Sequence, residues 1–193
     1  MDKRIDIMTD IETLGTDADS TIIQIGAMAF DIRTGEELYY FDMIADIEKN
    51  ERRLEVDGGT IKWWLKTDKD LFQKLLNNGK ESSEDVIFHF NEWLHALGLE
   101  FGYKNLYMWG NGILFDNKMI QHQMEALGLD YPIHFRNDRD LRTLVELATL
   151  KTGEKEWDLK KRFKDEDLRA HDALDDVKFQ IKVANGCYKI LKD

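Results

Sequence analysis

Residues 4–12, RIDIMTDIE, decide how the first part of this 193-residue chain folds. The run alternates with the period of a β-strand. One face carries Ile5, Ile7, Thr9 and Ile11, and the other carries Met8, Asp10 and Glu12. A carboxylate that faces a core costs several kcal/mol unless it has a partner. The two acids therefore lie either on the solvent face of an edge strand or in a site where they hold something.

Further strands and helices are expected along the rest of the chain. Residues 21–32 and 35–45 predict two more strands joined by a turn at DIRTGE, and residues 105–110 predict a short buried strand. Helices are predicted at residues 59–68, 82–98, 116–128 and 138–150, and from about Ala170 to Leu191. Ser82 with Asp85 resembles a capping box. Strands followed by helices mixed with strands indicate an α/β fold with a mixed sheet.

The composition indicates an ordinary soluble globular protein, with 42% hydrophobic and 34% charged residues. No apolar run is long enough to span a membrane, and the N-terminus does not read as a signal peptide. One cysteine, Cys187, excludes an internal disulfide and suggests a cytoplasmic location. We expect a single domain over residues 1–193. The net charge of −11 argues against broad attraction to a polyanion, although acids that bind divalent cations would escape that argument.

Acids gather at three places along the chain. Asp10 and Glu12 lie on the first strand, Asp116 follows a buried strand and a glycine-containing turn, and AHDALDDV opens the last helix. Each place also has a purely structural explanation. The acids could lie on a solvated edge strand, cap a helix N-terminus or interact favourably with a helix dipole. The occurrence of all three acid clusters in this order is harder to explain by structural roles alone. Spacing alone does not choose among the three acids of the last cluster.

The segments DIET, GNGILFDN and HDALDD resemble the three motifs of the DEDDh 3′–5′ exonucleases, a branch of the ribonuclease H-like superfamily. The segments IIQIGAMAFD, TIKWWL and RDLRTLVELA further resemble phage exonuclease A-type proteins and related bacterial 3′–5′ exoribonucleases. The resemblance runs from about Ile5 to Ala184. It implies a ribonuclease H-like mixed sheet of about five strands flanked by helices.

The resemblance also implies an activity and a set of residues. Asp10, Glu12, Asp116 and Asp176 would hold two divalent cations, Mg²⁺ or Mn²⁺, which stabilise charge on both oxygens of an in-line displacement. His171 would be the general base that takes a proton from the attacking water. The substrate would be a nucleic acid with a free 3′ end, single-stranded or with an overhang, cut to nucleoside 5′-monophosphates.

Substrate contacts are less closely defined. By resemblance, the backbone at Thr13 and Leu14 lies against the terminal nucleotide. Asn111 is a further candidate, with a turn-forming role as its alternative. Of the adjacent pair Trp63 and Trp64, one is expected in the core and the other exposed to stack on a base, and Trp64 is our candidate.

Several alternatives stay open at this point. The preference for DNA or RNA is undecided, because the contacts that read a 2′-hydroxyl cannot be placed. A homodimer is expected by resemblance only. The basic run at residues 160–164, KKRFK, is expected in a short loop and is either a solvated surface or a contact for phosphates. The same alternatives hold for Arg139 and Arg142. The rival function is a nucleic-acid-binding domain that keeps the same scaffold without turnover.

Overall fold

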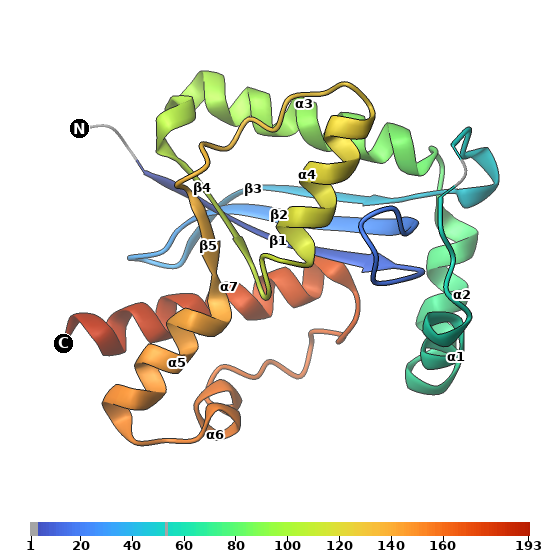
Figure 1. Ribbon diagram of the computed structural model, residues 1–193. Helices are drawn as coiled ribbons and strands as arrows, with labels where there is room; N and C mark the ends of the chain where they lie inside the picture. The colour runs from blue at the N-terminus through green and yellow to red at the C-terminus, as the bar shows by residue number, and fades with distance from the viewer. Residues whose placement is uncertain (1–3, 53) are drawn as a thin grey trace.

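A five-stranded mixed sheet forms the centre of the computed structural model, which describes residues 4–52 and 54–193 (Figure 1). Its strands are β1 (Ile5–Thr13), β2 (Ile22–Asp31), β3 (Glu36–Ile44), β4 (Leu106–Gly110) and β5 (Asp138–Asp140). They lie in the order β3-β2-β1-β4-β5. The first three form an antiparallel meander, whereas β4 runs parallel to β1 and β5 parallel to β4. The predicted mixed sheet is confirmed.

Helices cover both faces of this sheet. They are α1 (Gly58–Thr67), α2 (Lys69–Asn78), α3 (Ser83–Phe101), α4 (Asp116–Ala126), α5 (Leu141–Thr152), α6 (Glu156–Lys161) and α7 (Ala173–Lys192), with short 3₁₀ turns at Ile47–Lys49 and Tyr103–Asn105. Helices α3 and α4 lie on one face, α5 and α7 lie on the other, and α1 and α2 pack at one end (Figure 1). No helix among the described residues is both long and apolar enough to span a lipid bilayer.

Strand β1 is central, so its alternating faces are both covered. Ile5, Ile7 and Ile11 pack in the core cluster beneath α3 and α4, and Met8 packs in the cluster with α5 and α7. This rejects the solvated-edge explanation for the acids of β1. Asp10 and Glu12 point to the side of the sheet that α7 covers, as the alternation predicts.

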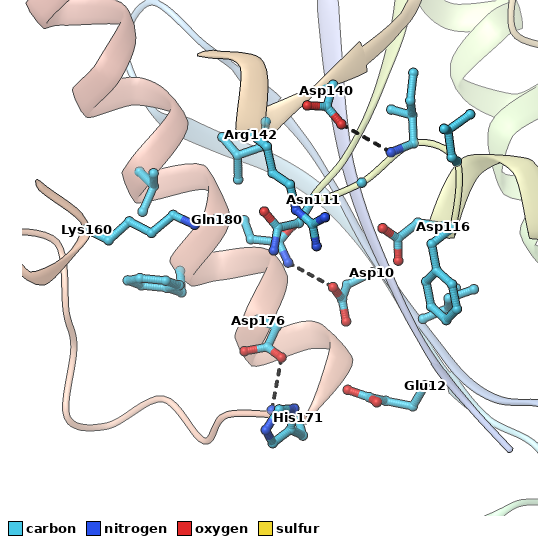
Figure 2. A pocket seen from close by; sticks show the side chains of 18 residues that line it. Asp10, Glu12, Asn111, Asp116, Asp140, Arg142, Lys160, His171, Asp176 and Gln180 are labelled. Carbon is cyan, nitrogen blue, oxygen red and sulfur yellow. Dashed lines mark hydrogen bonds between the residues drawn. The ribbon is translucent and has the colours of Figure 1, made fainter. Parts of the chain in front are cut away.

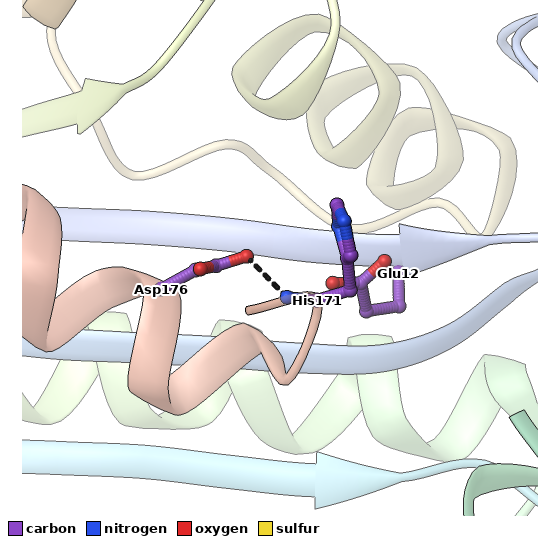
Figure 3. Close-up of side chains that lie close together, drawn as sticks. All are labelled: Glu12, His171 and Asp176. Carbon is purple, nitrogen blue, oxygen red and sulfur yellow. Dashed lines mark hydrogen bonds between the residues drawn. The ribbon is translucent and has the colours of Figure 1, made fainter. Parts of the chain in front are cut away.

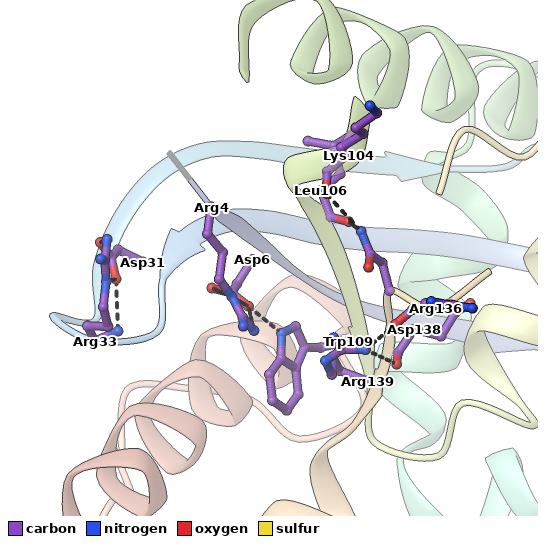
Figure 4. A network of polar contacts seen from close by, with 11 residues as sticks. Arg4, Asp6, Asp31, Arg33, Lys104, Leu106, Trp109, Arg136, Asp138 and Arg139 are labelled. Carbon is purple, nitrogen blue, oxygen red and sulfur yellow. Dashed lines mark hydrogen bonds and ion pairs between the residues drawn. The ribbon is translucent and has the colours of Figure 1, made fainter. Parts of the chain in front are cut away.

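A buried acid, Asp6, links β1 to β4 at the end of β1 that lies away from Asp10 and Glu12 (Figure 4). Asp6 is almost fully buried and accepts hydrogen bonds from Arg4 (Nη2–Oδ1, 2.6 Å) and from the indole of Trp109 (Nε1–Oδ1, 2.8 Å). Charge-assisted bonds of this kind satisfy a carboxylate that would otherwise be costly to bury. The network links β1, which carries Asp10 and Glu12, to β4, the strand that leads to Asp116.

Some boundaries differ from the sequence prediction. The capping box of Ser82 and Asp85 at the start of α3 is confirmed. Helix α2 was not predicted, and residues 138–140 form β5 rather than the first turn of a helix. There the parallel ladder with β4 extends the backbone, and Asp140 then caps α5 by accepting from Thr143 N. Within the basic run, Lys160 and Lys161 close α6 rather than lying in a loop.

Candidate active site

A cavity of about 610 Å³ lies where β1 and β4 end and α7 begins. Sites in α/β folds gather beyond the carboxyl ends of parallel strands, where loops and helix starts meet. The cavity is lined by residues from all three acid clusters, as Figure 2 shows. These residues are Asp10, Glu12, Asp116, His171 and Asp176.

Asp10 and Glu12 come to the cavity from the end of β1. Asp10 accepts a hydrogen bond from Gln180 of α7 (Nε2–Oδ1, 2.8 Å), which fixes one of its carboxylate oxygens. The antiparallel pairing of Asp10 with Gly26 and of Glu12 with Gln24 sets the height of both side chains. A central strand with helices on both faces therefore holds both acids on a rigid element.

Asp116 reaches the cavity as the first residue of α4. The chain leaves β4 at Gly110 and turns through Gly112, whose carbonyl accepts from the backbone N–H of Asp116 (3.2 Å). Gly112 has a φ of 155°, and an added Cβ would meet the Arg142 guanidinium. The turn thus sends a buried carboxylate back toward β1.

The third cluster is built by the turn before α7. The backbone N–H of His171 donates to Asp176 (Oδ2, 2.9 Å), which closes the turn on the acid of the helix (Figure 3). His171 has a φ of 67° and is the one non-glycine residue of the described chain with a positive φ. Ligand atoms of Glu12, His171 and Asp176 all lie within 4.8 Å of one another. Backbone strain of this kind is typical of functional sites.

The carboxylates of the site repel one another. Burial, followed by the charges of Asp116 and Asp176, raises the pKa of Asp10 well above its ordinary value. Burial and the neighbouring acids raise the pKa of Glu12 to about 10, and burial raises the pKa of Asp116 to about 7. Burial also raises the pKa of Asp176. Arg142 offsets part of the charge of Asp116, and divalent cations would supply further positive charge to this group of acids.

The family comparison agrees with this geometry. Residues 5–188 match the model of the 3′–5′ exoribonuclease Rv2179c-like domain. The chain belongs to this family. The family resemblance and the ribonuclease H-like fold expected from the sequence are thereby confirmed, because the match covers nearly the whole chain and the mixed sheet agrees with it.

Individual proteins give a consistent picture for this Rv2179c-like domain. It is 23% identical to the exodeoxyribonuclease of Enterobacteria phage T4 over 167 residues, which cover 75% of this chain and 72% of the phage protein. Its fold is similar to that of cell-death-related nuclease 4, with a TM-score of 0.67 and 18% identity. That match covers 99% of this chain but only 64% of the nuclease, so the chain spans less than two thirds of its length.

The fold is also similar to the nuclease domain of 3′hExo, a DEDDh family member whose structure was determined with rAMP bound. The TM-score is 0.64 at 17% identity, and the match covers 99% of this chain and 93% of that domain. This chain and the nuclease domain of 3′hExo therefore share one fold along nearly the full length of each.

The expected substrate contacts of the Rv2179c-like domain divide into two groups. Thr13 lines a second cavity beside Glu12, and Asn111 lines the main cavity with a buried side-chain oxygen that has no protein partner. Leu14 lies in the core instead. Its N–H donates to Thr21 and its carbonyl accepts from Asp57, so neither group is free for a nucleotide.

Of the two tryptophans, Trp64 is the core residue and Trp63 the exposed one. Trp64 is 1% exposed, stacks on Phe72 and donates from Nε1 to the carbonyl of Thr13 (3.1 Å). The prediction that one of the pair is buried is correct, but the choice of Trp64 as the stacking residue is wrong for this structure. Trp63 is 45% exposed, and its ring lies 5.0 Å from that of His171.

Of two further polar residues that line the site, Gln180 was not predicted, and Arg142 was expected as either a solvated residue or a phosphate contact. Gln180 lies one helical turn after Asp176, and this spacing of four residues on a helix could have indicated it. Arg142 contributes a guanidinium near Asp116 (Figure 2), where its charge opposes the rise in that acid's pKa. It follows β5, and because the position of β5 was not predicted, the two alternatives for Arg142 could not be separated from sequence.

Proposed function

We propose that this chain is a metal-dependent 3′–5′ exonuclease that removes nucleoside 5′-monophosphates from a nucleic acid with a free 3′ end. The observation that supports this best is the convergence of the three predicted motifs on one cavity. Four carboxylates and one histidine come from β1, α4 and the start of α7, segments far apart in the sequence. Family membership and the likeness in fold to 3′hExo support the same activity.

Asp10, Glu12, Asp116 and Asp176 would hold two divalent cations, Mg²⁺ or Mn²⁺. Their oxygen donors suit hard cations. Burial raises the pKa of all four acids, and the charges of neighbouring acids add to the rise for Asp10 and Glu12. When bound, the cations supply charge stabilisation for the attacking and leaving oxygens of the phosphodiester. Gln180 keeps one oxygen of Asp10 in a fixed orientation, a role in which losing the partner typically costs 10–100-fold in metal affinity or activity.

His171 would accept the proton of the attacking water. Histidine is the side chain that most often serves as a general base in enzymes. Its backbone is fixed by the bond to Asp176, and its ring lies against Trp63 at 5.0 Å and Trp64 at 6.3 Å. These contacts hold the imidazole beside Glu12 rather than letting it turn out to solvent.

The 3′-terminal nucleotide would enter the smaller cavity that Thr13, Thr60 and Trp63 line beside Glu12. Asn111 would donate to or accept from substrate at the opposite wall of the main cavity. Whether the sugar is ribose or deoxyribose is not decided by these contacts. The family description names an exoribonuclease and the phage relative is named an exodeoxyribonuclease, so both sugars belong in the test.

Matched 5′-labelled DNA and RNA oligonucleotides, single-stranded and with 3′ overhangs, test the proposal. With Mn²⁺ we expect a ladder that shortens from the 3′ end, and with EDTA we expect none. The Asp10→Asn variant serves as the inactive control, because it removes one charged ligand. Metal-dependent binding of the oligonucleotides without any cleavage would instead support a non-catalytic nucleic-acid-binding domain.

A further inference from the structure

A third cavity, of about 320 Å³, opens beside the candidate active site. It shares Lys160, Asp176 and Phe179 with the main cavity, so the two cavities adjoin at these residues. The cavity beside Thr13, of about 430 Å³, shares Ile11, Glu12 and Phe115 with the main cavity but shares no residue with this one. The main cavity therefore has two extensions, one past Glu12 and one past Asp176.

The extension past Asp176 is aromatic and apolar. Trp157 of α6 lines it and is 77% exposed, although it belongs to none of the core clusters of the described chain. Leu168 and Phe179 form further apolar wall. A large exposed aromatic ring above an apolar wall offers a face on which a planar base can stack.

Lysines surround this aromatic surface in a chain whose net charge is −11. Lys160, Lys161 and Lys164 all line the cavity. Among the residues that the structure describes, Lys160 and Lys164 form ion pairs with the surface carboxylates of Glu156 and Glu166, at 2.6 and 2.8 Å. Such surface pairs are weak enough to exchange for a phosphate. Lys161 makes no ion pair within the described residues.

The wall of the cavity is held in place before any ligand arrives. Arg169 makes two bonds to Asp68 of the segment between α1 and α2, at 3.0 and 2.8 Å. Its backbone N–H also donates to Asp175 (3.1 Å). Asp165, an acid on the wall, is paired with Lys182. The segment from α6 to α7 thus forms a preformed groove rather than a free loop.

We propose that this groove, which we call the Trp157 groove, binds the nucleotides that lie 5′ of the scissile linkage. A base stacks on Trp157 while Lys160, Lys161 and Lys164 contact the backbone phosphates. The inference rests on the proposed function, because the terminal nucleotide is assigned to the extension past Glu12 and the rest of the strand then leaves past Asp176. The occupant is a single strand, since its bases must be unpaired to stack.

Kinetics on two substrates of different length test the Trp157 groove. The first is a single-stranded 10-mer, and the second is the p-nitrophenyl ester of a nucleoside 5′-monophosphate, which has no upstream nucleotide. For Trp157→Ala we expect KM for the 10-mer to rise by about tenfold while hydrolysis of the ester stays unchanged. Trp157→Phe should recover most of the loss. Tyr40→Ala, at an exposed aromatic residue on β3, is the control.

Binding without turnover gives a second readout. Fluorescence anisotropy of a labelled 10-mer is measured with Ca²⁺ at several salt concentrations for wild type, Lys161→Ala and the control Lys189→Ala on α7. Loss of one phosphate contact should weaken binding and reduce the salt slope of log K by about 0.7. This measurement tests the groove even if the wild-type chain cleaves nothing, an outcome that would overturn only the proposed function.

Two outcomes would overturn the inference. Equal loss on the 10-mer and on the ester would show that Trp157 acts through the fold, and no change on either, with unchanged binding, would show that the groove stays empty.

Discussion

At the scale of single residues, His171 carries two properties at once. Its φ of 67° lies in the left-handed region, and its ring faces Glu12 and Asp176 within ligand distance. Left-handed backbone is costly for most residues but tolerated by asparagine. A substitution that accepts the left-handed backbone but lacks an imidazole therefore tests the role of the ring without changing the turn.

The variant His171→Asn should lower kcat by roughly 10²–10⁴-fold, because it removes a general base but keeps a side chain that accepts the backbone conformation. The bond from its backbone N–H to Asp176 should persist. Single-turnover assays with Mn²⁺ measure the rate, and isothermal titration measures Mn²⁺ binding, which should change little. A variant with near-normal kcat would remove the proposed role of His171. His171→Ala is the less informative change, since alanine adds backbone strain.

At the scale of elements, β2 and α7 approach so closely that only glycine fits between them. A Cβ at Gly26 would lie 2.5 Å from the backbone of Ala173 and Leu174, the first residues of α7. Gly26 also pairs with Asp10 across the sheet. The start of α7, which carries His171 and Asp176, is therefore positioned directly against the strand beside β1.

Gly26→Ala should destabilise the fold by about 1–3 kcal/mol, because the added methyl meets backbone that cannot yield easily. It should also lower kcat, since moving the start of α7 separates His171 and Asp176 from Glu12. Urea unfolding and the exonuclease assay measure the two effects. Gly58→Ala is the matched control, as nothing lies within 4 Å of its Cβ and both effects should be small. Full activity in a stable Gly26→Ala chain would contradict the argument.

Elements with a strong hydrophobic period were predictable from the sequence, whereas the short strand β5 was not. The alternation of β1 and the capping box of Ser82 were sufficient to place both elements. The three residues of β5 carry no period, because their conformation is set by pairing with β4. For the same reason the sequence identified the motif acids but left Arg142 between a solvated and a phosphate-contacting role. It also could not tell which of Trp63 and Trp64 faces the core.

At the scale of the whole molecule, folding concentrates negative charge in one place of an already acidic chain. Four buried or half-buried carboxylates with raised pKa values share one cavity, while the net charge is −11. A carboxyl whose folded pKa is raised favours the protonated form in the folded state. The folded chain then binds more protons than the unfolded chain, so stability falls as pH rises.

The metal-free protein should accordingly lose stability as pH rises from about 4, where unfolded carboxyls titrate, toward 7, where Asp116 titrates, and on toward 10 for Glu12. Divalent cations that bind the folded state should reverse the trend. At 100 times its Kd, one cation contributes about 2.7 kcal/mol, on the order of 5–10 °C in Tm for a chain of this size. Thermal unfolding from pH 5 to 9, with Mg²⁺, Mn²⁺ or EDTA, measures both effects.

The double variant Asp10→Asn, Asp116→Asn separates this site from the rest of the acidic surface. Both positions lie in the main cavity, and each substitution keeps the shape while removing a charge. In the double variant Tm should fall less between pH 5 and 8 than in the wild type, and added Mn²⁺ should raise it little. If Mn²⁺ instead raised both Tm values equally, the cation would be binding elsewhere on the acidic surface, and the four carboxylates would need a different partner.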